Sequence, residues 1–181
     1  MRKKAIEIDG QGETAASPAR KDKDARRVKT GAPLTLGYKQ HIRTDEEGHI
    51  EKPHITAAHA HESKHLAPLP EGVKANAAVY ADKGYDSKEN RTRRQEHNLR
   101  DRIMRRAQRN TVQSQEEKER NKALSETRYV VEQTFGTLHR KLQHKCTRYF
   151  GFIKVAAQSH LKAICINLLK AGNRVNVSVP A

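Results

Sequence analysis

A short apolar run, Ala77 to Ala81, that stops abruptly at Asp82 most limits what this chain can fold into. Apolar runs of this length between turn signals are typical of buried strands. The tripeptide 83–85, Lys-Gly-Tyr, follows as a turn. An acid at the carboxyl end of a buried strand lies where α/β sheets place their ligands, which makes Asp82 a candidate functional residue. The alternative is an Asp that only forms the turn.

Elements of both kinds are predicted around this strand. Alternating polarity from residue 34 to about residue 43 predicts a half-buried strand, and a polar turn joins it to a weaker strand over 49–56. The remaining predictions are a short helix within 57–66, a charged helix over 86–102, a brief strand at 103–104 and a loop over 105–121. Such a mixture places the chain in the α/β or α+β class, with a mixed sheet.

Two amphipathic helices are predicted near the end of the chain. Apolar residues at i, i+4, i+7 and i+11 from Val131 to Leu142 form one stripe. A last helix over 152–171 has a second stripe and ends at Gly172; the stripe comprises Val155, Ala156, Leu161, Ile164, Cys165, Leu168 and Leu169. We therefore expect three parts: a basic flexible N-terminal segment over 1–33, a domain over 34–172 and a tail over 173–181.

Positive charge is unevenly spread along the chain. Its 181 residues include 36 Lys and Arg against 21 Asp and Glu, a net charge of +15. Residues 88–109 hold nine basic residues and three acids, and the stretch from Arg128 to Lys170 holds eight basic residues and one acid. This pattern indicates an anionic polymer partner, with nucleic acid first, over an ordinary solvated surface. No apolar run reaches the roughly 18–20 residues needed to span a bilayer, so no membrane role is expected.

The single acid of that last basic stretch is Glu132. A lone acid among phosphate-binding groups would weaken DNA binding unless it holds a metal, and carboxylates are ligands that Mg²⁺ prefers. Two metal ions held by acids can activate a water and stabilise the leaving oxygen in phosphodiester displacement. The alternative is an exposed ion pair with Arg128, one turn earlier. His59, His61 and His65 could together bind zinc, although a polar helix entry is the ordinary interpretation of that segment.

Four segments resemble, in order, motifs of the catalytic domain of DDE transposases of bacterial insertion sequences. They are LGYKQH at 36–41, TAAHAHES at 56–63, YADKGYD at 80–86 and RYVVEQTFG at 128–136. The resemblance covers Asp22 to Gly172, and one departure is His59, which stands where the family has Asn. It implies an α/β fold of the RNase H-like type, a mixed sheet with flanking helices. It also implies that the fold is incomplete at the N-terminus.

The resemblance also assigns roles to residues of this chain. It implies that Asp82 and Glu132 are the second and third catalytic acids and bind Mg²⁺ or Mn²⁺. Arg128 would orient Glu132 or contact DNA, and Arg140 and Lys141 would contact DNA.

Other positions depart from the family pattern. Ser125 and His139 stand where the family has Tyr and Lys. The family also has a first acid on a first, central strand. Here Asp9, after the short run 5–8, is one candidate for it. The other expectation is an N-terminally truncated copy that has lost this acid and, with it, activity.

The function expected from this resemblance is DNA cleavage and strand transfer at the ends of an insertion sequence, by a metal-dependent transposase. It implies a bacterial cytoplasmic protein associated with the nucleoid, acting on DNA and usually as a homodimer. The main alternative is a non-catalytic remnant that binds DNA through its basic surface. A generic RNA- or DNA-binding protein is disfavoured, because stacking platforms need aromatic residues and the chain has three Phe and five Tyr.

Overall fold

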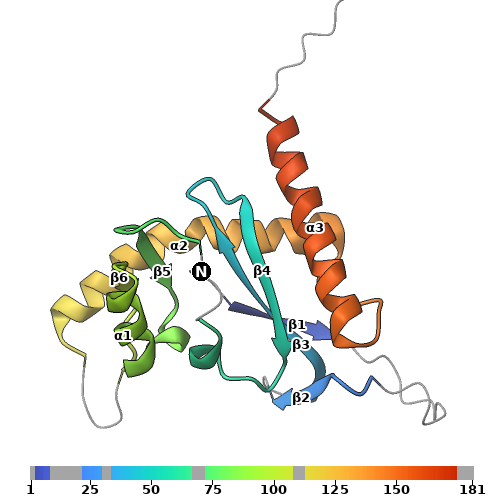
Figure 1. Cartoon of the computed structure of the whole chain (residues 1–181), viewed down its shortest axis with the longest axis horizontal. Helices are drawn as coiled ribbons and strands as arrows, with labels where there is room; N and C mark the ends of the chain where they lie inside the picture. Colours follow the sequence, from blue (N-terminus) through green and yellow to red (C-terminus); the bar gives the residue numbers. More distant parts are fainter. Residues whose placement is uncertain (1–2, 9–21, 30–33, 67–71, 108–112, 175–181) are drawn as a thin grey trace, which may run out of the picture.

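The computed structural model describes residues 3–8, 22–29, 34–66, 72–107 and 113–174 (Figure 1). In chain order the strands and helices are β1 Lys3–Ile8, β2 Arg26–Lys29, β3 Leu34–Thr44, β4 Ile50–Ala57, the 3₁₀ helix η2 Glu62–His65, β5 Ala78–Ala81, the 3₁₀ helix η3 Lys83–Tyr85, α1 Lys88–Glu96, β6 Arg100–Ile103, α2 Gln115–Leu142 and α3 Phe152–Gly172. Strands and helices mix as predicted, so the α/β class is confirmed.

Strand β3 is the centre of a four-stranded antiparallel sheet. It pairs with β1 on one side, and with β2 and then β4 on the other. The hairpin of β3 and β4 is the one predicted from the sequence. A second sheet consists of β5 and β6, which pair in parallel. The described strands thus form two sheets, one antiparallel and one parallel, and this arrangement is consistent with the predicted RNase H-like fold.

The prediction that β3 is half-buried is wrong. Residues 38–42 are all buried, on both faces of the strand. On one face Tyr38 packs with Val155 of α3, and Ile42 packs with apolar residues of α2 and α3. On the other face His41 lies under Tyr85 of η3. Polar residues of β3 are therefore buried because both faces of the strand are covered.

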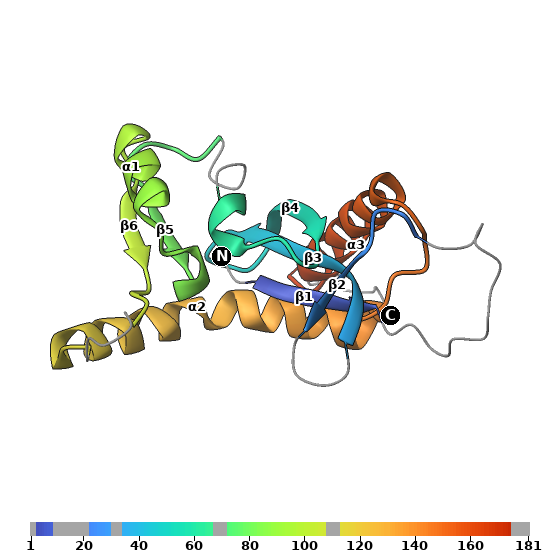
Figure 2. The same cartoon turned by 90° about the horizontal axis from the view of Figure 1, so that it is seen from below.

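The long helix α2 passes both sheets, from β5 to β3, as Figure 2 shows from below. It begins at Gln115, so the loop predicted over 105–121 is wrong for its second half. A capping box defines this start: the Ser114 hydroxyl accepts the backbone N–H of Glu117, and the Glu117 carboxylate accepts that of Ser114. The helix ends at Gln143, which has a left-handed backbone conformation.

The charged helix predicted over 86–102 is shorter in the structure. Ser87 caps α1, which stops at Glu96, and the chain turns at Asn98 into β6. The strand predicted at 103–104 therefore lies a few residues earlier. Within residues 1–33, for which flexibility was expected, the structure has β1 and β2.

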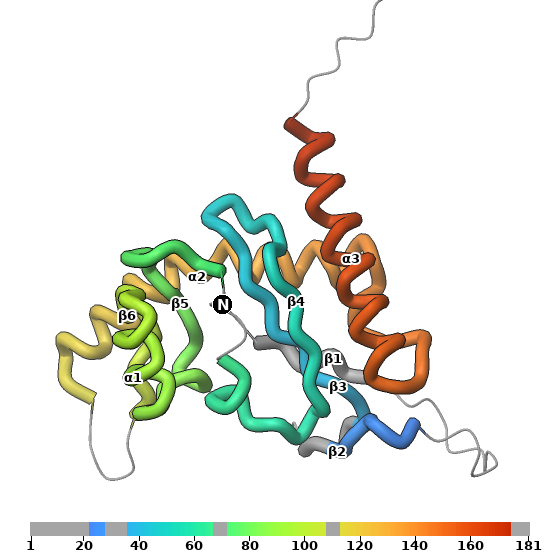
Figure 3. The backbone as a smooth tube through the Cα atoms, viewed as in Figure 1, coloured from blue at the N-terminus to red at the C-terminus, as the bar shows by residue number. Residues whose placement is uncertain are grey.

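Helix α3 has nearly the predicted bounds, but of the predicted stripe only Val155 is buried. It packs along β4 through Val155, Ser159, Ala163 and Ile166. Its other face is exposed, and the leucines and isoleucine at 161, 164 and 168 are 55–66% accessible. Figure 3 shows the C-terminal half of α3 extending beyond the sheet. Only the small and β-branched face of the helix reaches β4.

Candidate active site at the end of β5

Asp82 directly follows β5 and begins the turn of η3. Its Oδ1 accepts a hydrogen bond from the backbone N–H of Lys83 at 2.7 Å. Its Oδ2 lies 3.7 Å from Nη2 of Arg128, and the side chain is 30% exposed. Asp82 therefore caps the turn with one oxygen and presents the other to α2, so the turn-forming role and a functional role use different oxygens.

Arg128 and Glu132 lie one turn apart on the stretch of α2 that faces β5. The Arg128 side chain is 4% exposed, and its Nη1 also contacts the sulfur of Met104 just after β6. Residues four apart on a helix are neighbours about 6 Å apart. Glu132, half-buried, therefore lies one turn along α2 from the residue that contacts Asp82.

Glu132 also lines a small pocket on α2. This cavity of about 420 Å³ is bounded by Ser125, Glu126, Tyr129 and Glu132. Ser125, which stands where the family has Tyr, is thus beside Glu132. His139 is directed elsewhere, because its ring packs against the rings of Phe135 and His144, each with a centroid 6.4 Å away.

The other predicted DNA contacts are separated from this place. Arg140 folds back along α2, with its guanidinium over Gly136. Lys141 lines a larger pocket between the end of α2 and α3. Nine residues of helix separate Lys141 from Glu132, about 14 Å at 1.5 Å per residue. Asp9, the candidate first acid, lies outside the described residues.

A buried ion pair that the sequence reasoning missed lies beneath the Asp82 turn. Lys39 Nζ is 2.9 Å from Glu62 Oε1, and both side chains are at most 10% exposed. Lys39 also donates to the carbonyl of Ala60. Gly84 lies against this carboxylate, since a Cβ there would be 3.0 Å from Glu62 Oε2. Both residues of the pair lie in segments that resemble the family motifs. The pair itself could not be predicted, because no local pattern links a residue on a strand with one in a distant 3₁₀ helix.

A second buried contact joins the same turn to β3. The Tyr85 hydroxyl lies 2.5 Å from Nδ1 of His41, and burial raises the pKa of Tyr85 well above its ordinary value. Asn90 of α1 donates to the carbonyls of Tyr85 and Ser63, at 2.9 and 2.8 Å. The segments 36–41, 56–63 and 80–86, far apart in sequence, therefore meet at the turn that follows Asp82.

The histidines at 59, 61 and 65 do not assemble into a zinc site. His59 is exposed, and His61 caps η2 by accepting the backbone N–H of Ser63. His65 packs with His41 and His54, with ring centroids 5.7–5.8 Å apart. The ordinary interpretation of a polar helix entry is therefore the better one.

The ligand chemistry at the end of β5 fits a hard divalent cation. Asp82 and Glu132 offer carboxylate oxygens, the donors that Mg²⁺ and Mn²⁺ prefer. Arg128 lies beside the same carboxylate, with its Nη2 3.7 Å from Asp82 Oδ2. In the described part of the chain, the one group of three metal-capable side chains within mutual reach lies elsewhere, in the β3–β4 turn. Its members are Asp45, Glu47 and His49, and Glu47 there pairs with Arg174.

Comparisons with known proteins agree with the motifs. Residues 2–168 match the family described as Transposase DDE domain. The chain is 56% identical over 180 residues to the transposase for insertion sequence element IS1106 of Neisseria meningitidis serogroup B, a match that covers 99% of this chain and 62% of that protein. The chain thus spans less than two thirds of that relative's length. No solved structure matches it. None of the described helices is long and apolar enough to cross a membrane. With the family match over most of its length and this degree of identity, the chain belongs to the family of DDE transposase domains.

Proposed function

We propose that this chain contributes Asp82 and Glu132 to the metal-dependent active site of a transposase that cuts and joins DNA at the ends of a bacterial insertion sequence. The observation that supports this is the approach of β5 to α2: Asp82 and Arg128 are 3.7 Å apart, and Glu132 is one turn further along the helix. Carboxylates from a strand end and a facing helix are suited to share a cation.

Each residue has a separate role in this proposal. Asp82 and Glu132 would hold Mg²⁺ or Mn²⁺, and the cation would supply activation of the attacking oxygen and stabilisation of the leaving oxygen of a phosphodiester. Arg128 is a positioning residue: its guanidinium is buried, so it holds Asp82 in place against α2. The partners are the ends of the element and target DNA, with a homodimer as the acting species in the bacterial nucleoid.

The test is a strand-transfer assay with Mn²⁺ and DNA that carries the ends of the element. Asp82→Asn and Glu132→Gln keep the side-chain shape and remove the charge, so each should lower product formation about 100-fold or more. Glu126→Gln is the matched control, because Glu126 is an exposed acid on the same helix beside Glu132. Equal losses in all three variants would overturn the assignment.

A second candidate is a DNA-binding protein without chemistry. One feature favours it: from Gln133 to Arg174 the chain has eight Lys and Arg and no Asp or Glu. This candidate predicts DNA binding that weakens steeply with salt. It also predicts no metal-dependent product from the wild-type chain. A wild-type product that disappears with Asp82→Asn excludes it.

A further inference from the structure

One face of α3 is apolar and exposed, while the opposite face packs on β4. The side chains of Leu161, Ile164 and Leu168 are 55–66% exposed, and Ile153 at the start of the helix is 83% exposed. Single exposed apolar residues are normal on a protein surface, but a contiguous row of large ones marks an interaction site. The exposed face of α3 therefore has the character of a surface that another molecule covers.

The exposed residues follow the spacing of a seam between two paired helices. Ala157, Leu161, Ile164 and Leu168 are all exposed and are separated by four, three and four residues. Apolar residues that recur alternately three and four apart occupy the a and d positions of a heptad, where two helices interlock. At about 100° per residue, these four side chains lie within about 60° of the helix surface. The seam formed by these four residues is therefore suited to receive another helix.

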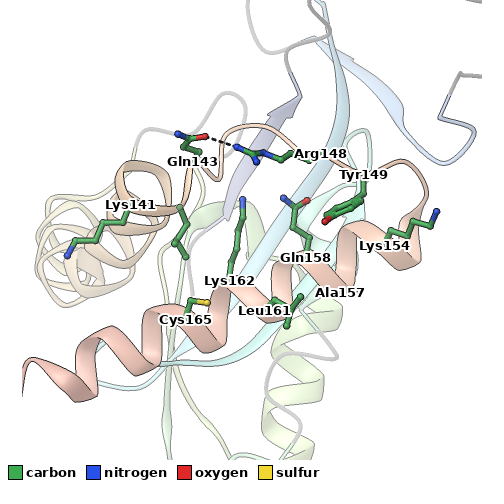
Figure 4. A pocket seen from close by; sticks show the side chains of 11 residues that line it. Lys141, Gln143, Arg148, Tyr149, Lys154, Ala157, Gln158, Leu161, Lys162 and Cys165 are labelled. Carbon is green, nitrogen blue, oxygen red and sulfur yellow. Dashed lines mark hydrogen bonds between the residues drawn. The ribbon is translucent and has the colours of Figure 1, made fainter.

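The lysines in the second half of α3 point away from the seam. Figure 4 shows Lys162 rising from the helix toward Arg148. Lys170 Nζ donates to the backbone carbonyl of Glu47 in the β3–β4 turn, at 2.9 Å. The residues that flank the seam are Ile153, Gln158, His160, Cys165 and Asn167. A second α3 therefore meets no Lys or Arg beside the four seam positions, whereas a helix with acidic flanks would find no such partner there.

Lys154 favours an antiparallel orientation of two such helices. It is exposed and lies just before Ala157, at the N-terminal end of the seam. In a parallel pair the two Lys154 ammonium groups would face each other. In an antiparallel pair with Leu161 opposite Ile164, Lys154 lies beside the C-terminal end of the other helix, which carries partial negative charge. The same register sets the small Ala157 against the large Leu168, so the two surfaces also match in shape.

We propose that two copies of this chain associate through the exposed face of α3, as an antiparallel helix pair. The C-terminal half of α3 extends beyond its own sheet (Figure 3), so it is free to lie along the N-terminal half of the other α3. The inference rests on the proposed function in one respect, because that proposal makes a homodimer the acting species and this one names the surface that forms it.

The size of the seam sets how strong this pair should be. A helix of 21 residues is about 30 Å long and about 10 Å wide, so the pair covers about 300 Å² of each copy, below the about 800 Å² of a standard interface. We therefore expect a dimer that dissociates in the micromolar range.

The test is analytical ultracentrifugation of the nuclease-treated chain without DNA. The wild-type mass should rise from 20.5 kDa to twice that value as the concentration passes through the micromolar range. The double variant Leu161→Gln, Leu168→Gln should raise the dissociation constant about tenfold or more and keep the wild-type circular dichroism, because both side chains are exposed in one copy. Tyr129→Gln is the matched control: it removes an exposed aromatic side chain from α2 and should keep the wild-type constant.

Three results would overturn the proposal. One is a wild-type chain that stays monomeric at about 100 µM, which would assign the face to a different polypeptide. Another is an equal change, or no change, in the α3 variant and in the control. The third is a dimer that dissolves as salt is added. Each copy carries a net charge of +15, so screening should tighten an apolar pair, whereas association bridged by residual nucleic acid weakens with salt.

Disulfide cross-linking tests the orientation of the two helices. The two native cysteines, Cys146 and Cys165, are exposed and are first replaced by Ser. Chains with Ala157→Cys are then mixed with chains with Leu168→Cys and oxidised. The antiparallel register places these positions opposite each other, whereas two copies of the same position lie about 16 Å apart along the axis, beyond the roughly 7 Å that a disulfide spans. Cross-links should therefore form in the mixture and not within either kind of chain, and the reverse result overturns the proposal.

The helix pair and the proposed function can fail separately. Asp82→Asn should abolish strand transfer and keep the wild-type dissociation constant, because Asp82 lies at the end of β5 and outside α3. Strand transfer that survives Asp82→Asn, in a chain whose dimer depends on Leu161 and Leu168, overturns the proposed function alone. Strand transfer that requires Asp82, in a chain whose association ignores Leu161 and Leu168, overturns the helix pair alone.

Discussion

Two buried histidines should make this fold sensitive to mild acid. His41 on β3 is fully buried; its Nε2 donates to Thr56 Oγ1, which itself donates to a backbone carbonyl, so Nδ1 accepts from the Tyr85 hydroxyl. His144, just after α2, donates from Nε2 to Gln40 Oε1. Burial is the main cause that lowers the pKa of each imidazole, to about 3. Both histidines are therefore neutral in the folded protein at neutral pH.

The sign and size of the effect follow from these values. An unfolded His has a pKa of about 6.5, so the unfolded chain takes up a proton first as the pH falls. The stability that comes from keeping the imidazole neutral is complete above about pH 7 and is lost from about pH 6.5 downward, toward pH 3. At about pH 5 the loss is about 2 kcal/mol for one His and about 4 kcal/mol for both. Burial also lowers the pKa of His54 and His65, which acts in the same direction.

The measurement is urea unfolding followed by circular dichroism at about pH 8 and about pH 5. His144→Gln keeps a donor for Gln40 and cannot titrate, so the difference in unfolding free energy between the two conditions should shrink by about 2 kcal/mol. His59→Gln, at an exposed position, should leave that difference unchanged. Equal wild-type stability at both pH values, or a similar change in the two variants, would refute the reasoning.

Three further predictions concern stability in the same unfolding assay. Glu62→Leu leaves the buried Lys39 ammonium without its carboxylate and should cost about 3 kcal/mol, whereas adding Lys39→Met should recover part of that loss; additive losses would contradict a coupled pair. Gly48→Ala should cost about 2 kcal/mol or more, because φ is +81° and a Cβ would lie 2.8 Å from a hydroxyl of α2; a neutral effect would contradict this packing. Ile166→Ala should cost about 3 kcal/mol and Leu161→Ala less than about 0.5 kcal/mol, because Ile166 is buried and Leu161 is exposed. The reverse order would mean that α3 buries the stripe predicted from the sequence.

Local pattern was enough to predict the elements whose residues differ sharply from their neighbours. The apolar run of β5 stops at Asp82, and the hairpin of β3 and β4 turns where polar residues and Gly48 interrupt two strands. The start of α2 was missed because its first turns, from Gln115 onward, are polar and exposed, so no apolar stripe marks them. The signal was present in the capping box of Ser114 and Glu117.

The buried face of α3 could not be predicted from the helix alone. The sequence has apolar residues on two sides, and periodicity favoured the larger ones, such as Leu161 and Leu168. The structure buries the side with Ser159 and Ala163, because those small residues let the helix approach β4 closely. Which of two apolar faces is covered depends on the partner surface, which is tertiary information.

For the candidate site too, some residues can be predicted from local sequence, whereas others depend on tertiary contacts. Asp82 and Glu132 were predicted one at a time, from a strand end and from an isolated acid, and each signal is local. The buried contacts beneath the Asp82 turn were missed because each one joins two segments that are distant in sequence. They are Lys39 with Glu62, and His41 with Tyr85. Neither pair contributes a group to the proposed chemistry, yet both fix the turn that presents Asp82 to α2. The family-like segments 36–41 and 56–63 therefore carry residues that position the turn of Asp82. Under the proposed function, a substitution in them should act on how Asp82 is held, and through that on cation binding, rather than on the reacting phosphate itself.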